Sequence, residues 1–229
     1  VYALKEVSLG KWHAKPKVLY EGELAKGSIQ QIKCYGEHVY FTELTINDEV
    51  QIVRQMCYNN VKNEVIRICT QDDKLYPQSI SIVNGKLYYT IFNGNYKDEQ
   101  NNIVYRAELD GSNGAPCFEM PVLARISSDG NKLIVEDLVT KSEKSDEQKS
   151  ISLYSEDGEV LGEFLTNQLS HVHDTFPGDE KYLFVVNYAD KCYEMQAVDK
   201  QKLSENKVEV NKLFKMEQEK LYPEIIVHN

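Results

Sequence analysis

This chain of 229 residues lacks most of the short signals that announce a function. It has no nucleophile elbow, P-loop, dinucleotide fingerprint or recognisable Ser/His/Asp arrangement, so no familiar catalytic class is indicated. It has no run of 18 apolar residues, and its first residues lack the basic and apolar regions of a signal peptide. Its net charge is −10, not positive, which opposes binding to nucleic acid or anionic membranes. We expect no nucleic-acid partner, no membrane insertion and no cofactor.

Cysteine is scarce and scattered. The five cysteines, Cys34, Cys57, Cys69, Cys117 and Cys192, include no Cys-x-x-Cys pair, which argues against a zinc cluster or a disulfide framework. A disulfide between Cys57 and Cys69 across a hairpin near Asn63 is an alternative. Otherwise we expect the cysteines to act as small buried hydrophobic residues.

What the chain does have is a period. A Tyr-rich strand pattern that begins with Gly or Asp starts at residues 36, 85, 130 and 179, so its starts lie 49, 45 and 49 residues apart. Such a repeat in a chain of short strands is typical of a β-propeller, in which each repeat forms one four-stranded blade. The sequence therefore predicts an all-β propeller of four-stranded antiparallel blades.

The second period shows the four strands most clearly, at residues 78–83, 86–91, 102–109 and 117–120. Asn84-Gly85 has the turn chemistry of a tight hairpin between the first two strands. We expect one domain over residues 1–229, with blades at about 28–71, 77–120, 121–165 and 170–214. Residues 208–222 also fit a helical period, but the blade pattern favours a strand at 207–214.

The two ends of the chain predict a fifth blade. Lys74-Leu-Tyr-Pro77 returns as Lys220-Leu-Tyr-Pro223, so residues 223–227 have the pattern of a further first strand. Residues 1–7 and 16–21 have the pattern of a third and a fourth strand. Residues 1–23 with 221–229 would then form a composite closing blade, which hides exposed strand edges. Alternatively this blade is incomplete, and the chain is part of a parent propeller with six to eight blades.

Two strings resemble a known blade motif. Gly85-Lys-Leu-Tyr-Tyr89 and Ile103-Val-Tyr-Arg-Ala-Glu-Leu-Asp-Gly-Ser-Asn113 look like the repeat of bacterial YWTD-like and TolB-like propellers. Ser127-Ser-Asp-Gly130 stands where the TolB-like repeat has Ser-Pro-Asp-Gly, and no Tyr-Trp-Thr-Asp tetrapeptide is present. The resemblance implies a bacterial propeller outside the cytoplasm, at the cell surface, lipid-anchored or secreted.

The sharpest candidate site is His171-Val-His173-Asp174. Alternation along an extended segment would point His171 and His173 the same way, and two imidazoles with a carboxylate suit a transition metal. The segment precedes the second strand of a blade, so it lies where propellers bind ligands around their channel. The alternative is a polar entry loop whose side chains hydrogen-bond to strand ends.

Tyrosine is abundant, with 15 residues against one tryptophan. Tyr88, Tyr89, Tyr105, Tyr182, Tyr188 and Tyr193 occupy predicted strands, where we expect most of them to pack in the core. Tyr96 lies in the predicted loop at 93–101, where its ring could contact a sugar or a peptide. We take His171, His173, Asp174 and Tyr96 as the candidate ligand-binding residues.

The sequence therefore favours a non-catalytic binding module whose ligand is a protein or a carbohydrate. The alternative is a carbohydrate-active enzyme, either a metal-assisted polysaccharide lyase or a hydrolase. An enzyme would need His171 and His173 to converge with further ligands or carboxylates, whereas a binding module would not. A third reading is a scaffold or sensor domain of a larger protein.

Overall fold

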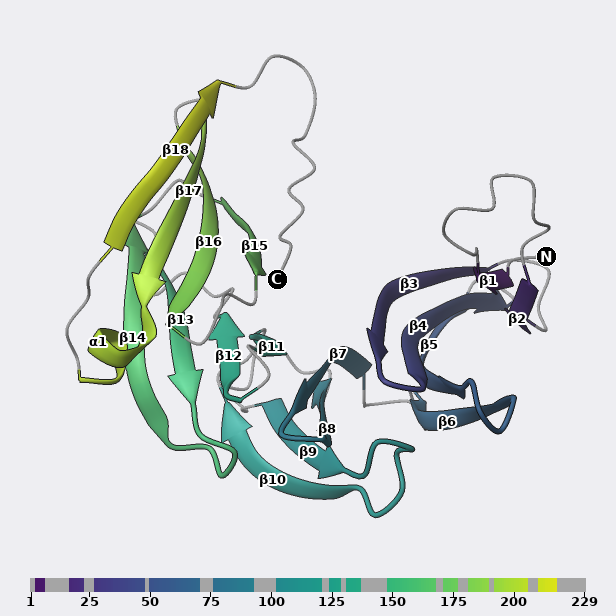
Figure 1. The fold of residues 1–229 in the computed structure, drawn as a ribbon. Helices are drawn as coiled ribbons and strands as arrows, with labels where there is room; N and C mark the ends of the chain where they lie inside the picture. The colour runs from purple at the N-terminus through teal and green to yellow at the C-terminus, as the bar shows by residue number, and fades with distance from the viewer. Residues whose placement is uncertain are drawn as a thin grey trace. The chain divides into compact units, whose positions relative to one another are not determined.

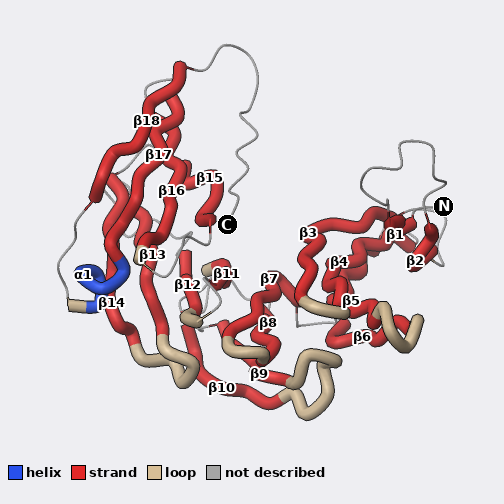
Figure 2. Tube along the Cα trace, in the orientation of Figure 1, coloured by secondary structure: helices blue, strands red, loops and turns tan. Residues whose placement is uncertain are grey.

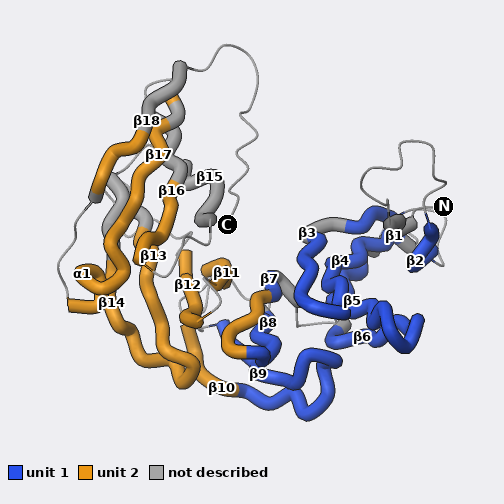
Figure 3. Tube along the Cα trace, viewed as in Figure 1, with its two compact units in different colours: residues 1–80, 85–116 blue, residues 81–84, 117–229 orange. Residues whose placement is uncertain are grey.

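The structure is a computed structural model built almost entirely from β-strands (Figures 1 and 2). It describes residues 3–6, 17–22, 27–47, 50–70, 76–92, 102–120, 124–128, 131–136, 148–167, 171–176, 181–189, 192–205 and 210–217. The chain divides into two compact units (Figure 3). Unit 1 comprises residues 1–80 and 85–116, and unit 2 comprises residues 81–84 and 117–229. Each unit is described by itself.

Unit 1 begins with a small antiparallel sheet. Strand β1 (Ala3–Glu6) pairs with β2 (Lys17–Glu21), and the register shifts between Leu4 and Lys5. These strands match the third and fourth strands that the sequence predicts for the composite blade. The predicted first strand at 223–227 lies outside the described residues.

The first four-stranded sheet follows directly in unit 1. Its strands run in the order β3 (Gly27–Tyr35), β4 (His38–Asn47), β5 (Val50–Asn59) and β6 (Glu64–Thr70). Phe41, Met56 and Tyr58 form a buried apolar cluster on one face, where Leu19 and Tyr20 from β2 pack against it. Tyr40, one residue away on β4, lies on the opposite face because side chains alternate along a strand. Its hydroxyl donates to the carbonyl of Leu109 in the next repeat at 2.7 Å.

The second four-stranded sheet contains β7 (Tyr76–Val83), β8 (Lys86–Phe92), β9 (Asn102–Ala107) and β10 (Ala115–Met120), again in sequence order. The turn between β7 and β8 is Asn84-Gly85, with φ of 46° and 73°. Two successive positive φ angles define the type of turn that matches the twist of a two-residue hairpin. The predicted turn chemistry therefore forms the predicted hairpin.

Unit 2 holds two further four-stranded sheets. The third sheet contains β11 (Arg125–Ser128), β12 (Leu133–Glu136), β13 (Gln148–Tyr154) and β14 (Val160–Asn167). The fourth contains β15 (His171–Phe176), β16 (Tyr182–Ala189), β17 (Cys192–Asp199) and β18 (Val210–Glu217). All neighbouring strands whose pairing is resolved in these two sheets are antiparallel. Residues 210–217 form a strand, as the blade pattern predicts, and not a helix.

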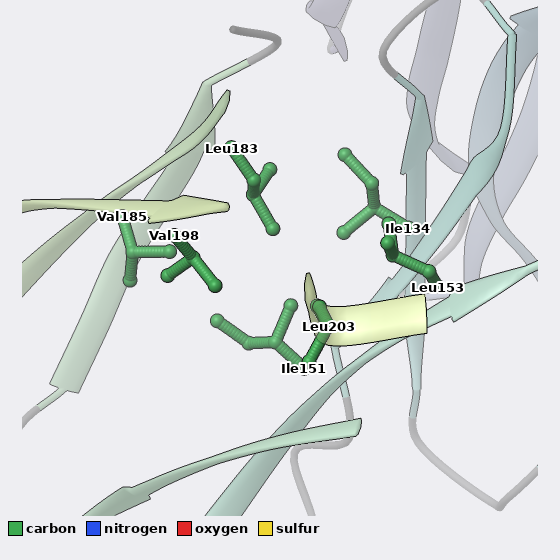
Figure 4. Packing of buried hydrophobic residues seen from close by; sticks show 7 residues of the cluster. All are labelled: Ile134, Ile151, Leu153, Leu183, Val185, Val198 and Leu203. Carbon is green, nitrogen blue, oxygen red and sulfur yellow. The ribbon is translucent and has the colours of Figure 1, made fainter. Parts of the chain in front are cut away.

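A short helix, α1 (Lys200–Ser204), interrupts the connection between β17 and β18. The Asp199 carboxylate caps it by accepting from the backbone N–H groups of Gln201 and Lys202 at 3.0 and 3.1 Å. Leu203 of this helix is fully buried in the core of unit 2 (Figure 4). That core also contains Ile134, Ile151, Leu153, Leu183, Val185 and Val198. The helix therefore helps to join the third sheet to the fourth.

Gly162 on β14 lies directly against this helix. A Cβ atom at Gly162 would collide with the backbone carbonyl of Leu203. Only a residue without a side chain allows β14 and α1 to approach this closely.

All five cysteines carry free thiols. Cys57 lies opposite Ile66 and Cys69 lies opposite Gln55, so the β5–β6 register does not bring the two thiols together and the predicted disulfide alternative is wrong. Cys57 and Cys192 are buried, as expected, whereas Cys34 is exposed. None of the helices described in the chain is long and apolar enough to span a bilayer.

Candidate ligand-binding site

The predicted His171-Val-His173-Asp174 cluster lies on β15, the end strand of the fourth sheet. Its backbone register places His171 opposite Tyr188 and Val172 opposite Asn187 on β16. Asp174 then lies opposite Val186, so His173 is an extra residue in the ladder. Tyr96 lies outside the described residues.

This register changes which positions of the cluster share a face. Tyr188 and Val186 are two residues apart on β16, so the positions opposite them, His171 and Asp174, belong to the same face of the sheet. The extra residue at His173 interrupts the simple alternation that would pair His171 with His173. The register therefore pairs an imidazole position with a carboxylate position. Ligand binding by these residues stays a prediction.

The described side chains do not themselves assemble a metal centre. Among the residues whose side chains the structure describes, no group of three His, Cys, Asp or Glu could hold a metal ion. The side chains of His171, His173 and Asp174 are outside that set.

Two side chains that sequence reasoning missed bind carbonyls of β7, itself the end strand of the second sheet. In unit 1, the Lys33 ammonium on β3 donates to the carbonyl of Ile80 at 2.5 Å. In unit 2, the Ser128 hydroxyl on β11 donates to the carbonyl of Ile82 at 2.5 Å. Side chains thus satisfy carbonyls on a strand that has an unpaired edge.

Lys33 differs from Lys62, Lys86 and Lys212. Lys33 is exposed as a whole residue. Its ammonium is nevertheless desolvated, and this desolvation lowers the pKa of Lys33 below the ordinary value of a lysine. The exposure belongs to the side chain as a whole, while the ammonium itself lies against the backbone of β7. No ion pair links Lys33 to a carboxylate in the described part of the chain. By contrast, Lys62, Lys86 and Lys212 each pair with a glutamate.

Unit 1 also contains a buried polar network that no sequence pattern indicated. The Glu43 side chain is 3% exposed, and its Oε2 pairs with Nη1 of Arg54 at 3.0 Å. The Tyr20 hydroxyl donates to the other carboxylate oxygen, Oε1, at 2.6 Å. Arg54 also donates to the hydroxyl of Thr45 at 3.3 Å. Because Glu43 and Arg54 are eleven residues apart and meet only in the β4–β5 register, no local pattern announces this pair.

Among the tyrosines whose side chains the structure describes, several pack in the core, as predicted for Tyr88 and Tyr89. Tyr88 and Tyr89 are 0% and 6% exposed, and the Tyr89 and Tyr105 rings stack with their centroids 5.3 Å apart. Tyr40 and Tyr58 are buried as well. Burial raises the pKa of Tyr89 to about 12, because a phenolate would lose its hydration there.

No protein-family model and no curated protein matches this chain. Solved structures do match. One is acylaminoacyl peptidase in complex with Z-Gly-Gly-Phe-chloromethyl ketone, with a TM-score of 0.59, 12% identity and coverage of 83% of this chain and 33% of that chain. Another is the β-propeller domain of the trilobed protease from Pyrococcus furiosus, with a TM-score of 0.54, 14% identity and coverage of 83% and 58%.

A third match is oligogalacturonate lyase in complex with manganese, with a TM-score of 0.54, 12% identity and coverage of 88% of this chain and 56% of that chain. This chain thus spans a third of the peptidase and less than 60% of the other two. At such identities the likeness concerns the fold alone.

The repeated four-stranded antiparallel sheets and these neighbours define the class of protein: the chain is a β-propeller module. The propeller part of the predicted resemblance is therefore confirmed. Its neighbours include peptidases and a lyase, so the fold does not by itself assign an activity.

Proposed function

We propose that this chain is a non-catalytic binding module of the TolB-like and YWTD-like kind that works outside the cytoplasm. Its ligand, a protein or a carbohydrate, binds at the channel face of the propeller, where the first strands of the blades lie. Tyr96 belongs to the predicted loop at 93–101 and supplies an aromatic contact. The proposal extends to a surface-attached or secreted location in a bacterium.

The observation that carries this proposal is the β15 register. His171 and Asp174 occupy positions on one face of a first strand. An imidazole and a carboxylate at positions on one face offer both donors and acceptors to hydroxyl or amide groups. First strands surround the central channel in propellers, so these positions suit a polar ligand that enters there.

The test is a binding screen with three single variants. His171→Ala and Asp174→Ala should each weaken capture of a ligand found with the wild-type chain by about tenfold, the loss expected for one buried hydrogen bond. Thr175→Ala is the matched control, because Thr175 lies opposite Val185, at a position of the other face. Equal loss in all three variants, or none in any, would refute the site.

The second candidate is a metal-assisted polysaccharide lyase or hydrolase. Two observations favour it: a histidine and an aspartate position on one face of a first strand, and a structural neighbour that is an oligogalacturonate lyase in complex with manganese. Imidazole and carboxylate are both ligands of divalent transition metals. Crystals soaked with Mn²⁺, Zn²⁺ and Ca²⁺ test it by anomalous scattering. Metal density at His171 and Asp174 would favour the enzyme over the binding module.

A further inference from the structure

A backbone carbonyl anchors the Lys33 ammonium, and no carboxylate in the described part of the chain pairs with it. Its ammonium has three N–H donors, and one of them reaches the carbonyl of Ile80 at 2.5 Å. No hydrogen bond to a described residue uses the other two. This hydrogen bond holds the ammonium in place, but a backbone carbonyl carries no negative charge to neutralise it.

Lys86 and Lys212 show the ordinary arrangement of a lysine at the surface. Lys86 donates to both carboxylate oxygens of Glu108 at 2.7 Å, and Lys212 pairs with Glu194 at 3.0 Å. These cations are neutralised at the surface. Lys33 instead lies on β3, a first strand, and reaches the end strand of the neighbouring sheet within unit 1.

We propose that the Lys33 ammonium binds one carboxylate group of a small ligand at the β3–β7 junction of unit 1. An ammonium that is partly desolvated, and that no described carboxylate neutralises, gains a charge-assisted hydrogen bond when an anion binds. The direction of the Lys33 pKa agrees, because a carboxylate within ion-pair distance would raise this pKa and desolvation alone lowers it. The proposal uses neither His171 nor Asp174.

The net charge of the chain favours anions that carry a single negative charge. A net charge of −10 repels ligands with several negative charges, and a single lysine offsets only one of them. A monocarboxylate therefore fits better than a dianionic phosphate. Two sources present such a group: a uronic acid of a saccharide, and the C-terminal carboxylate of a peptide.

The experiment compares each acid with its neutral counterpart. Calorimetry measures binding of galacturonic acid and its methyl ester, and of trialanine and trialanine amide. Reductive ¹³C-methylation of the lysines then gives an NMR signal for Lys33, assigned by its absence in Lys33→Gln. This variant keeps an N–H donor for the Ile80 carbonyl but removes the charge. Lys86→Gln, which removes a paired lysine, is the matched control.

We expect at least one free acid to bind, its neutral counterpart to bind at least tenfold more weakly, and the Lys33 pKa to rise on binding. Lys33→Gln should lose about tenfold in affinity, whereas Lys86→Gln should not. The acid that binds identifies the source of the carboxylate. The proposal is overturned if neither acid binds, if acid and neutral forms bind equally, or if Lys33→Gln binds like wild type. Since the His171 site is not involved, this result is independent of the proposed function.

Discussion

The hydroxyl of Tyr20 donates a 2.6 Å hydrogen bond to the buried carboxylate of Glu43, and so joins β2 to the second strand of the first blade. The Tyr20 ring also lies 5.2 Å from the ring of Phe41, between the same two strands. The contact therefore combines apolar packing with the satisfaction of a buried charge. It ties the β1–β2 sheet to the first blade.

Tyr20→Phe should lower the free energy of unfolding by about 1–2 kcal/mol, because it keeps the ring packing and removes one hydrogen bond to a charged group. Urea unfolding measures the change. Tyr35→Phe is the control, since Tyr35 is 42% exposed. Equal stability of Tyr20→Phe and wild type would show that the hydrogen bond contributes nothing.

Arg54→Met should cost more than Tyr20→Phe, about 3 kcal/mol, because it leaves the Glu43 carboxylate buried without a counter-charge. The double variant Glu43→Gln/Arg54→Met should recover part of this loss, since no charge then remains in the interior. Lys62→Met breaks the exposed pair with Glu64 and should change stability by less than about 1 kcal/mol. A double variant that is less stable than Arg54→Met would contradict the ion-pair interpretation.

Gly162→Ala should destabilise the protein by about 1–3 kcal/mol, because the added methyl group meets the Leu203 backbone and must displace α1 from the core. Gly36→Ala is the control, because it adds a methyl group where there is no crowding. Gly36 has a φ of 53° and open space around it, so its variant should show only the penalty for positive φ, about 1 kcal/mol. A larger loss in the Gly36 variant than in the Gly162 variant would refute the close packing of α1.

Alkaline pH should destabilise the fold. Burial raises the pKa of the Cys57 and Cys69 thiols to about 12, from 9.0 in the unfolded chain. The stabilisation that each buried thiol provides is present in full below pH 9. It is lost as the pH rises towards 12, because in this range the unfolded chain releases the thiol protons and the folded chain keeps them. Each thiol should add up to about 1.4 kcal/mol per pH unit to the slope.

Urea unfolding under reducing conditions from pH 8 to pH 11 checks this prediction. Cys69→Ala should show a shallower decline than wild type, whereas Cys34→Ala, which removes an exposed thiol, should not. Identical slopes in all three proteins would mean that the buried thiols do not control the alkaline transition.

The repeat and its turns could be predicted from the sequence because their causes are local. Asn84-Gly85 forms the predicted hairpin, and the strand predicted at 86–91 is β8 (Lys86–Phe92). The extra residue at His173 could not be predicted, since it arises from the pairing of β15 with β16. Helix α1 is too short to show a helical period. Its only sequence signals are the capping residue Asp199 and one apolar residue, Leu203.

The residues of the candidate sites were likewise predicted only in part. The sequence identified β15 by its clustered His and Asp residues, which are neighbours along the chain. It did not identify Lys33 or the pair of Glu43 and Arg54, whose partners come from other strands or other sheets. Contacts between distant segments leave no local pattern in a single sequence.

Recovery of the ligand shows whether this propeller binds its ligand without changing it. The wild-type chain is incubated with peptide and polysaccharide mixtures, with and without Mn²⁺. Mass spectrometry then compares the bound and the unbound material with the mixture before incubation. If the chain is a binding module, a retained ligand is recovered with unchanged mass, and His171→Ala and Asp174→Ala retain less of it. Shortened or unsaturated saccharides, or cleaved peptides, which form with wild type and not with these variants, would contradict it and establish an enzyme.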